Sequence, residues 1–156
     1  MASPSPDHRP DPSWEQPPDP HAGGAPPPGT GAAAVTAFRR AEQLLDDRRP
    51  LDALKALAPL LEAEQAAASV HLLAARAYLA SAQFRRAEDG FLRVLELDPA
   101  DHYARFALGR TLQRQSRLVE ARTQLRMAAA MDPRPEYQEA LGEVSANIAL
   151  RGAYGT

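Results

Sequence analysis

Cysteine and histidine, which often supply nucleophilic, acid–base or metal-binding chemistry, are scarce in this 156-residue sequence. The absence of cysteine excludes disulfides, thiolate zinc sites and a cysteine nucleophile. Of the four histidines, His8 and His21 lie near the N-terminus, while His71 and His102 are 31 residues apart without a carboxylate or second histidine at ligand spacing. No glycine-rich phosphate loop, nucleophile elbow or metal-binding helix motif is present. The sequence therefore predicts a protein that is not an enzyme and that needs no metal or cofactor.

Arginine is the one abundant side chain with a specific binding chemistry, because its planar guanidinium can form two hydrogen bonds with a carboxylate. It accounts for 17 of the 18 basic residues. The formal net charge is nevertheless −2, whereas proteins that coat nucleic acid normally carry a strong positive charge. Coating nucleic acid is therefore not expected to be the main task of this chain.

Composition divides the chain into a tail and one domain. Ten of the 15 prolines precede residue 30, and this segment has almost no apolar side chains to bury. We therefore expect residues 1–31 to be disordered, with polyproline II character. Their charged side chains give a net charge of −3, so the remaining 125 residues carry +1 of the total of −2. The predicted domain spans residues 32–150, and residues 151–156 form a short C-terminal tail.

The start of the chain does not read as a targeting segment. Its first residues, MASPSPDHRP, lack the continuous apolar stretch of about 7–15 residues that a secretory signal needs. No segment approaches the roughly 18 consecutive apolar residues of a membrane span. The sequence therefore predicts a cytoplasmic protein that does not contact membranes.

The elements that must position the arginines are helices. From about Ala32 onward the chain is rich in alanine, leucine, arginine and glutamate, which favour helices, and has few β-branched residues. Turn residues and prolines place breaks at residues 46–50, 81–83, 98–101, 115–117 and 132–135. The helices between them are about 13–15 residues long and joined by short turns, the pattern of antiparallel helical hairpins. The predicted class is all-α.

Five columns of similar residues recur at a step of 34. They are Ala41/Ala75/Gly109, Leu44/Tyr78/Leu112, Ala53/Ala87/Ala121, Leu57/Phe91/Leu125 and Pro99/Pro133. The small residues allow two helices to approach where they cross, the large ones fill the space beside the crossing, and proline ends each unit. Because one hairpin cannot bury its apolar face alone, about three stacked units are the usual minimum.

This pattern resembles the tetratricopeptide repeat, W-x2-L-G-x2-Y, then A-x3-F, then P. The two best units read His71-x2-Ala74-Ala75-x2-Tyr78, Ala87-x3-Phe91, Pro99, and Arg105-x2-Leu108-Gly109-x2-Leu112, Ala121-x3-Leu125, Pro133. The resemblance covers repeats at about 34–67, 68–101 and 102–135, the first degenerate because Gln65 replaces its closing proline. It implies a right-handed α-solenoid of antiparallel helix pairs, and residues 136–150 look like its capping helix. Pro50 suits the first position of a helix, whereas Pro59 should kink one.

The resemblance also implies a groove on the concave face, lined by the first helix of each pair. The residues at its inward positions are Val35, Phe38, Glu42, Leu45 and Asp46 in the first unit, Ser69, Leu72, Arg76, Leu79 and Ala80 in the second, and Tyr103, Phe106, Arg110, Gln113 and Arg114 in the third, with Tyr137 from the cap. One end is acidic and the other basic. The predicted peptide-binding residues are Leu72, Arg76, Leu79, Tyr103, Phe106, Arg110, Gln113 and Arg114.

The predicted function is a non-catalytic adaptor that binds a protein segment with acidic and apolar residues. The alternative for these side chains is a solvated arginine face with partly buried aromatic packing. Two other functions remain open: a structural subunit that self-associates into a homo-oligomer, and a module that binds RNA through its arginines. Family members that bind chaperone C-termini carry a Lys and an Asn where Phe38 and Glu42 stand here, so this kind of docking is not supported.

Three further features have simpler structural readings. His71 stands where the family has tryptophan and is interpreted as a packing residue, and His102 as the start of a helix. The mixed charges of residues 85–96 and 117–126 read as solvated helix faces. Trp14 is either an inert linker residue or a docking motif that could occupy the basic groove of its own or a neighbouring molecule.

Overall fold

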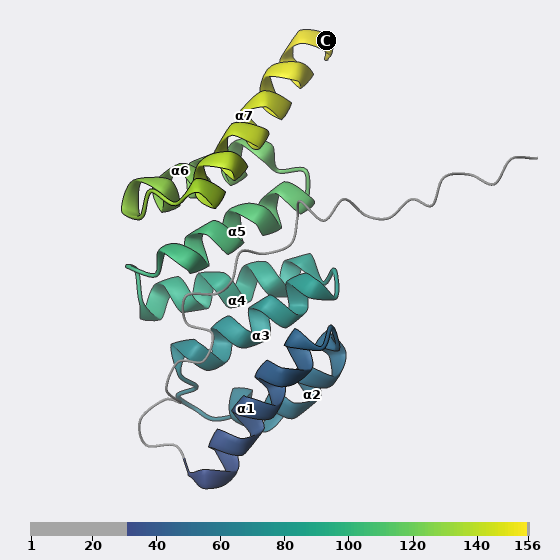
Figure 1. Cartoon of the computed structure of the whole chain (residues 1–156), viewed down its shortest axis with the longest axis vertical. Helices are drawn as coiled ribbons and strands as arrows, with labels where there is room; N and C mark the ends of the chain where they lie inside the picture. Colours follow the sequence, from purple (N-terminus) through teal and green to yellow (C-terminus); the bar gives the residue numbers. More distant parts are fainter. Residues whose placement is uncertain (1–30, 156) are drawn as a thin grey trace, which may run out of the picture.

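The computed structural model describes residues 31–155, which fold into seven α-helices (Figure 1). They are α1 (Ala32–Asp46), α2 (Pro50–Leu61), α3 (Ala68–Ala80), α4 (Phe84–Leu97), α5 (His102–Arg114), α6 (Leu118–Met131) and α7 (Pro135–Tyr154). Three helical hairpins stack in chain order and α7 ends the array. This part of the chain contains no strand, so the predicted all-α solenoid is confirmed. The expectations for residues 1–30, including the two histidines and Trp14, lie outside the described residues.

The helix boundaries repeat with the predicted period of 34 residues. Pro50, Phe84 and Leu118 begin the second helices of the hairpins, and Ala68 and His102 begin α3 and α5. Pro50 is at the first position of its helix, as predicted. All five predicted breaks coincide with connections between helices.

The turn inside each hairpin has the same geometry. Each contains one non-glycine residue with a positive φ, namely Arg48 (60°), Ala82 (59°) and Ser116 (61°). In the second hairpin, the N–H of Gln83 donates to the carbonyl of Tyr78 at 2.8 Å, and the N–H of Ala82 donates to that of Leu79 at 3.1 Å. This pair of bonds is a Schellman motif, which satisfies the last carbonyls of a helix.

Small residues lie where the paired helices cross, as the repeat predicted. Ala75, Ala87 and Ala121 are fully buried. A Cβ at Gly109 would lie 2.7 Å from Cγ of Leu125, closer than packed side chains allow. The sequence did not reveal a second close approach, at Gly90 of α4, where a Cβ would lie 2.8 Å from Cβ of Ala75.

The helices form two layers with different spacing. α1 contacts α3, α3 contacts α5 and α5 contacts α7, whereas no contact joins α2 to α4 or α4 to α6. The first helices of the hairpins are therefore closer to one another than the second helices are. The array curves, and its inner face is formed by α1, α3, α5 and α7.

Two elements differ from their predicted extents. α2 ends at Leu61, two residues after Pro59, and a six-residue connection leads to α3. α7 continues to Tyr154, so residues 151–154 are its last turn and not part of a C-terminal tail. The extension follows from the helix-favouring Leu150 and Arg151, and the helix continues through Gly152 to Tyr154. No helix in the described part is long and apolar enough to cross a membrane.

Candidate functional site

Arg110 and Gln113 of α5 together bind both oxygens of one carboxylate. Arg110 Nη1 donates to Oε2 of Glu143 and Gln113 Nε2 donates to Oε1, both at 2.9 Å. Arg110 Nη1 also donates to Oε1 of Gln113 at 2.9 Å, which orients the two side chains relative to each other. Because residues three apart on a helix are neighbours, α5 alone builds this site, which we call the carboxylate seat.

The carboxylate in the seat comes from α7, the helix that was predicted only as a cap. The side chain of Arg110 is 15% exposed and that of Glu143 is 53% exposed. The repeat pattern could not find Glu143, because the 34-residue step from Arg110 leads to Val144, which is fully buried. Glu143 is the residue before Val144, and its side chain, which is longer than that of valine, reaches the seat.

The other two predicted arginines belong to α3 and to the end of α5. Arg76 of α3 is one repeat step before Arg110, is partly buried, and belongs to a helix that contacts α5. Arg114 is the last residue of α5 and is exposed. Its guanidinium carbon lies 5.2 Å from the ring centre of Phe84, within the range of a cation–π interaction. Three arginines thus come from adjacent inner helices.

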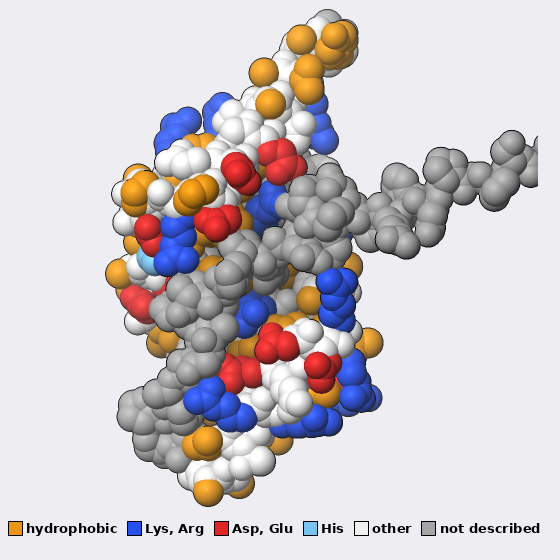
Figure 2. Space-filling model, in the orientation of Figure 1, with side chains coloured by type: hydrophobic (Ala, Val, Ile, Leu, Met, Phe, Trp, Pro, Cys, Tyr) orange, Lys and Arg blue, Asp and Glu red, His pale blue; other side chains and the backbone are white. Residues whose placement is uncertain are grey.

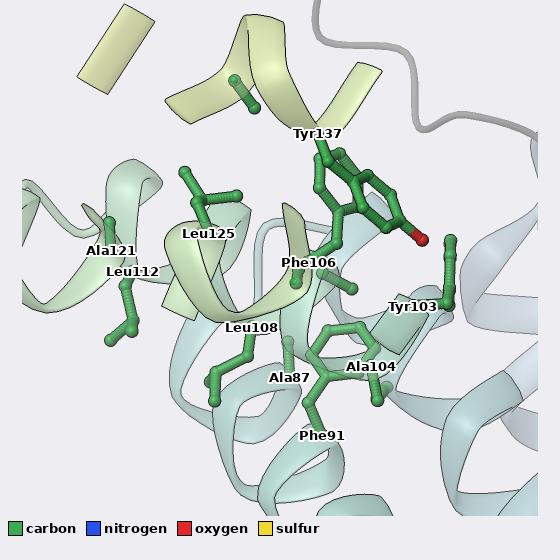
Figure 3. Close-up of a cluster of buried hydrophobic side chains, with 14 of the residues drawn as sticks. Ala87, Phe91, Tyr103, Ala104, Phe106, Leu108, Leu112, Ala121, Leu125 and Tyr137 are labelled. Carbon is green, nitrogen blue, oxygen red and sulfur yellow. The ribbon is translucent and has the colours of Figure 1, made fainter. Parts of the chain in front are cut away.

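The predicted apolar residues of this face are mostly buried. Leu72, Tyr103 and Phe106 are only 5%, 1% and 2% exposed, and Leu79 is half-buried. Phe106 stacks on Tyr137 of α7 with ring centres 4.6 Å apart (Figure 3). This burial agrees with the alternative of aromatic packing residues, and direct contact of these side chains with a ligand stays a prediction. The polar part of the face is formed by the arginines and Gln113.

A second polar cluster ties the start of α5 to the turn before α7. His102 begins α5, as predicted, and its Nδ1 lies 2.9 Å from the hydroxyl oxygen of Tyr137. Nε2 of His102 is 3.4 Å from Oδ2 of Asp132, to which Nε of Arg134 donates at 2.6 Å. Burial raises the pKa of Tyr137 to about 12, so this phenol stays protonated near neutral pH. The cluster holds helices together and leaves the ring of Tyr137 packed against Phe106.

The described histidines do not form a metal site. His71 is half-buried in α3, and burial, followed by the charge of Arg93, lowers its pKa. Within residues 31–155 no group of three or more His, Asp or Glu side chains could hold a metal ion. The interpretation of His71 as a packing residue agrees with its partial burial.

The first unit contributes a different surface to the inner face. Phe38 of α1 is buried, and Glu42 accepts a hydrogen bond from Arg39 at 2.9 Å. Of the remaining inward positions, Asp46 and Ala80 are exposed. Those that are half-buried are Val35, Leu45 and Ser69. The side chains at the positions of the chaperone clamp are therefore a buried phenylalanine and a carboxylate that is already paired.

Figure 2 shows basic and acidic side chains interspersed on the face that it presents. The charges of residues 85–96 and 117–126, outside the inner face, are only partly a solvated surface. Glu88 of α4 accepts hydrogen bonds from Arg117 at 2.7 Å and from Gln115 at 2.9 Å, which joins α4 to the turn between α5 and α6. With Arg85 and Asp89 these residues line an open pocket of about 400 Å³. The lining charges of opposite sign balance one another, so the pocket has no evident preference for a charged ligand.

Comparisons with solved structures identify the fold. The chain is similar to the second TPR domain of human RPAP3 in complex with the HSP70 peptide SGPTIEEVD, with TM-score 0.67, 18% identity, and coverage of 72% of this chain and 95% of that chain. It is also similar to the first TPR of Spaghetti (RPAP3) bound to the HSP90 peptide SRMEEVD, with TM-score 0.71, 16% identity, and coverage of 77% and 96%. For the Arabidopsis OM64 TPR domain the corresponding values are 0.68, 18%, 72% and 93%.

These likenesses confirm the tetratricopeptide-repeat resemblance at the level of the fold. No protein-family model and no curated protein matches the sequence. At 16–18% identity the shared property is the arrangement of the helices. The ligand-binding properties of this chain are therefore argued from its own side chains.

Proposed function

We propose that this chain is a non-catalytic adaptor that binds a segment of a partner protein on the inner face of α1, α3, α5 and α7. The observation that supports the proposal most directly is the carboxylate seat, in which Arg110 and Gln113 hold both oxygens of Glu143 at 2.9 Å. Charge-assisted hydrogen bonds of this kind are among the stronger polar interactions that a surface offers to a ligand. A carboxylate of a partner can bind there in the same geometry.

The proposed ligand is a peptide with acidic and apolar residues. Arg76 and Arg114 add two further cationic side chains from α3 and α5, and half-buried Leu79 offers apolar contact. Two structural neighbours were solved with peptides that end in EEVD, which supports an acidic ligand for this fold. Because Phe38 and Glu42 stand at the clamp positions, the proposed ligand is an internal or terminal acidic segment other than a chaperone C-terminus.

The test is binding of fluorescent peptides to the full chain, measured by polarisation. The panel contains peptides with alternating acidic and apolar residues and the same peptides with Asn and Gln in place of the acids. We expect Arg110→Glu with Arg114→Glu to weaken binding of the acidic peptides at least ten-fold, about 1.4 kcal/mol or more. Arg122→Glu with Arg126→Glu on α6 makes the same charge change outside the inner face and serves as the control.

Glu143→Gln tests the seat itself, because it removes the internal carboxylate that competes with the ligand. We expect this variant to bind the acidic peptides several-fold more tightly than the wild type. Equal affinity of all variants for the panel would refute the proposal. Binding of single-stranded RNA that weakens steeply with salt, without peptide binding, would favour the nucleic-acid alternative.

A further inference from the structure

The acidic residues of the N-terminal segment have a regular spacing and a charge opposite to that of the arginines on the inner face. Asp7, Asp11, Glu15 and Asp19 follow one another at steps of four residues, and prolines fill much of the sequence between them. Proline-rich chains favour the polyproline II conformation, which rises about 3.1 Å per residue, so four residues span roughly 12 Å. Successive acidic side chains are therefore roughly 12 Å apart along such a chain, and the three residues per turn point each about 120° away from the one before it.

The inner face presents arginines at equivalent positions of neighbouring helices. Arg76 and Arg110 stand 34 residues apart, at equivalent positions of α3 and α5, and these two helices contact each other. The carboxylate seat shows that α5 already binds a carboxylate of the same chain, Glu143. The first 31 residues carry a net charge of −3, whereas the remaining 125 residues carry +1. The charge of this segment is thus complementary to the arginines at the basic end of the inner face.

The length of the connecting chain permits the contact. Residue 19 is joined to Gly31, immediately before α1, by 12 residues that span up to roughly 37 Å at 3.1 Å per residue. α1 and α5 are separated by two inner-helix steps, or about 20 Å. A tether of this length gives an effective concentration of about 1 mM, which favours even a weak contact.

We infer that the acidic segment 7–20 of the same chain occupies the inner face, with its carboxylates near Arg76 of α3 and Arg110 of α5. The inference rests on the proposed function, because it assigns an internal ligand to the same surface. An external partner then has to displace this segment, so the chain is autoinhibited toward acidic peptides. Trp14 lies between Asp11 and Glu15 and would follow the acids onto this face.

Trp14 is the single tryptophan of the chain, so its fluorescence reports on this segment in the intact protein. We expect Arg76→Glu with Arg110→Glu to shift the Trp14 emission to longer wavelength and to lower its anisotropy. Arg122→Glu with Arg126→Glu is the matched control and should leave both unchanged. A wild-type signal that changes with protein concentration, together with a dimeric mass, would overturn occupancy within one chain. Identical spectra for the wild type and the Arg76/Arg110 variant would overturn the inference altogether.

A competition experiment changes only the segment and therefore cannot unfold the array. The probe is a labelled peptide with the sequence of residues 7–20, added to the full chain. Neutralising the segment with Asp11→Asn, Glu15→Gln and Asp19→Asn should tighten probe binding about ten-fold, because the internal competitor is removed. Glu62→Gln, Glu64→Gln and Glu96→Gln make the same charge change at exposed sites of the array outside the inner helices and should have no effect.

The outcomes separate the inference from the proposed function. If unrelated acidic peptides bind the wild type and the neutralised chain equally well, self-occupancy is wrong while the adaptor function stands. If the residue 7–20 peptide binds neither protein, self-occupancy is wrong as well. If no acidic peptide binds any variant, the proposed function itself fails.

Discussion

Glycine at position 109 is required by the packing of α5 against α6. A Cβ there would lie 2.7 and 2.8 Å from two carbons of Leu125 and 3.3 Å from the backbone oxygen of Ala121. A Cβ at Gly142 of α7 would meet no atom of a neighbouring element within 4 Å, so this glycine lies in open space. The two helical glycines therefore differ only in what surrounds them.

We expect Gly109→Ala to lower the free energy of unfolding by about 1–3 kcal/mol, because the added methyl group overpacks the crossing. Gly142→Ala should raise it by about 0.5–1 kcal/mol, because alanine is the better helix former. Urea titration followed by circular dichroism measures both. The explanation of close approach is wrong if Gly109→Ala is as stable as Gly142→Ala.

His71 makes stability depend on pH. Burial, followed by the charge of Arg93, lowers its pKa below the ordinary value of 6.5. The unfolded chain then binds more protons than the folded chain below pH 6.5, so this histidine lowers the free energy of unfolding as the pH falls.

We expect His71→Gln to remove this contribution. Relative to the wild type, the variant should gain stability as the pH is lowered from 7.5 to 5, and the difference between the two should be constant above pH 7.5. Urea titrations of both proteins at several pH values measure it. A difference that does not change between pH 7.5 and 5 would contradict the lowered pKa.

Packing roles could be predicted for residues whose type recurs at the 34-residue step. Gly109 belongs to a column of small residues, whereas Gly90 stands in a column with Ala56 and Gln124 and is not distinguished by it. Glu143 was missed for a related reason, because the α7 residue at the step from Arg110 is Val144. Whether such a side chain reaches across to the next helix depends on the angle at which the two helices pack. The repeat pattern of the sequence carries no information about that angle.

At the scale of elements, the three hairpin turns share one strained residue each. The left-handed conformation costs an L-residue about 1–2 kcal/mol, and Arg48, Ala82 and Ser116 all adopt it. Glycine avoids this cost but loses more entropy on folding, by about 0.4–1 kcal/mol. A glycine at such a position should therefore be moderately stabilising.

We expect Ala82→Gly to raise the free energy of unfolding by about 0.5 kcal/mol, the difference between the two terms. Ala80→Gly, two residues earlier in the last turn of α3, should lower it by about 0.5–1 kcal/mol, because that position is helical. Chemical denaturation of the two variants side by side provides the measurement. A loss of stability in both would show that the turn does not favour glycine.

Helix ends could be predicted where a proline or a polar turn marks them, as at Asp98 to Asp101. The connection of residues 62–67 has neither signal, and the end of α7 at Tyr154 has none before Gly155. Alanine and leucine favour helices wherever packing permits them, so these boundaries are decided by tertiary contacts. Pro59, where a kink is predicted, lies two residues before the end of α2, where little helix remains to be redirected.

At the scale of the molecule, the core consists of two parts of unequal size. The N-terminal part contains nine buried residues of α1–α3, four of which are alanines, whereas the part formed by α3–α7 contains nineteen. Tyr78 packs against both. Because each repeat is stabilised mainly by its neighbours, the terminal hairpin with the smaller core should open first.

We therefore expect amide hydrogens of α1 and α2 to exchange at least ten-fold faster than those of α5 and α6, a difference in opening free energy of about 1.4 kcal/mol or more. Hydrogen exchange with mass spectrometry under native conditions measures this. Leu57→Ala and Leu125→Ala remove equally buried side chains from the two parts. Leu57→Ala should accelerate exchange in α1 and α2 while leaving α5 and α6 protected, whereas Leu125→Ala should affect the whole array. Equal acceleration of exchange in all helices by Leu57→Ala would contradict this, because the domain would then open as one cooperative unit. In that case α1 and α2 could not open while α5 keeps the carboxylate seat in place.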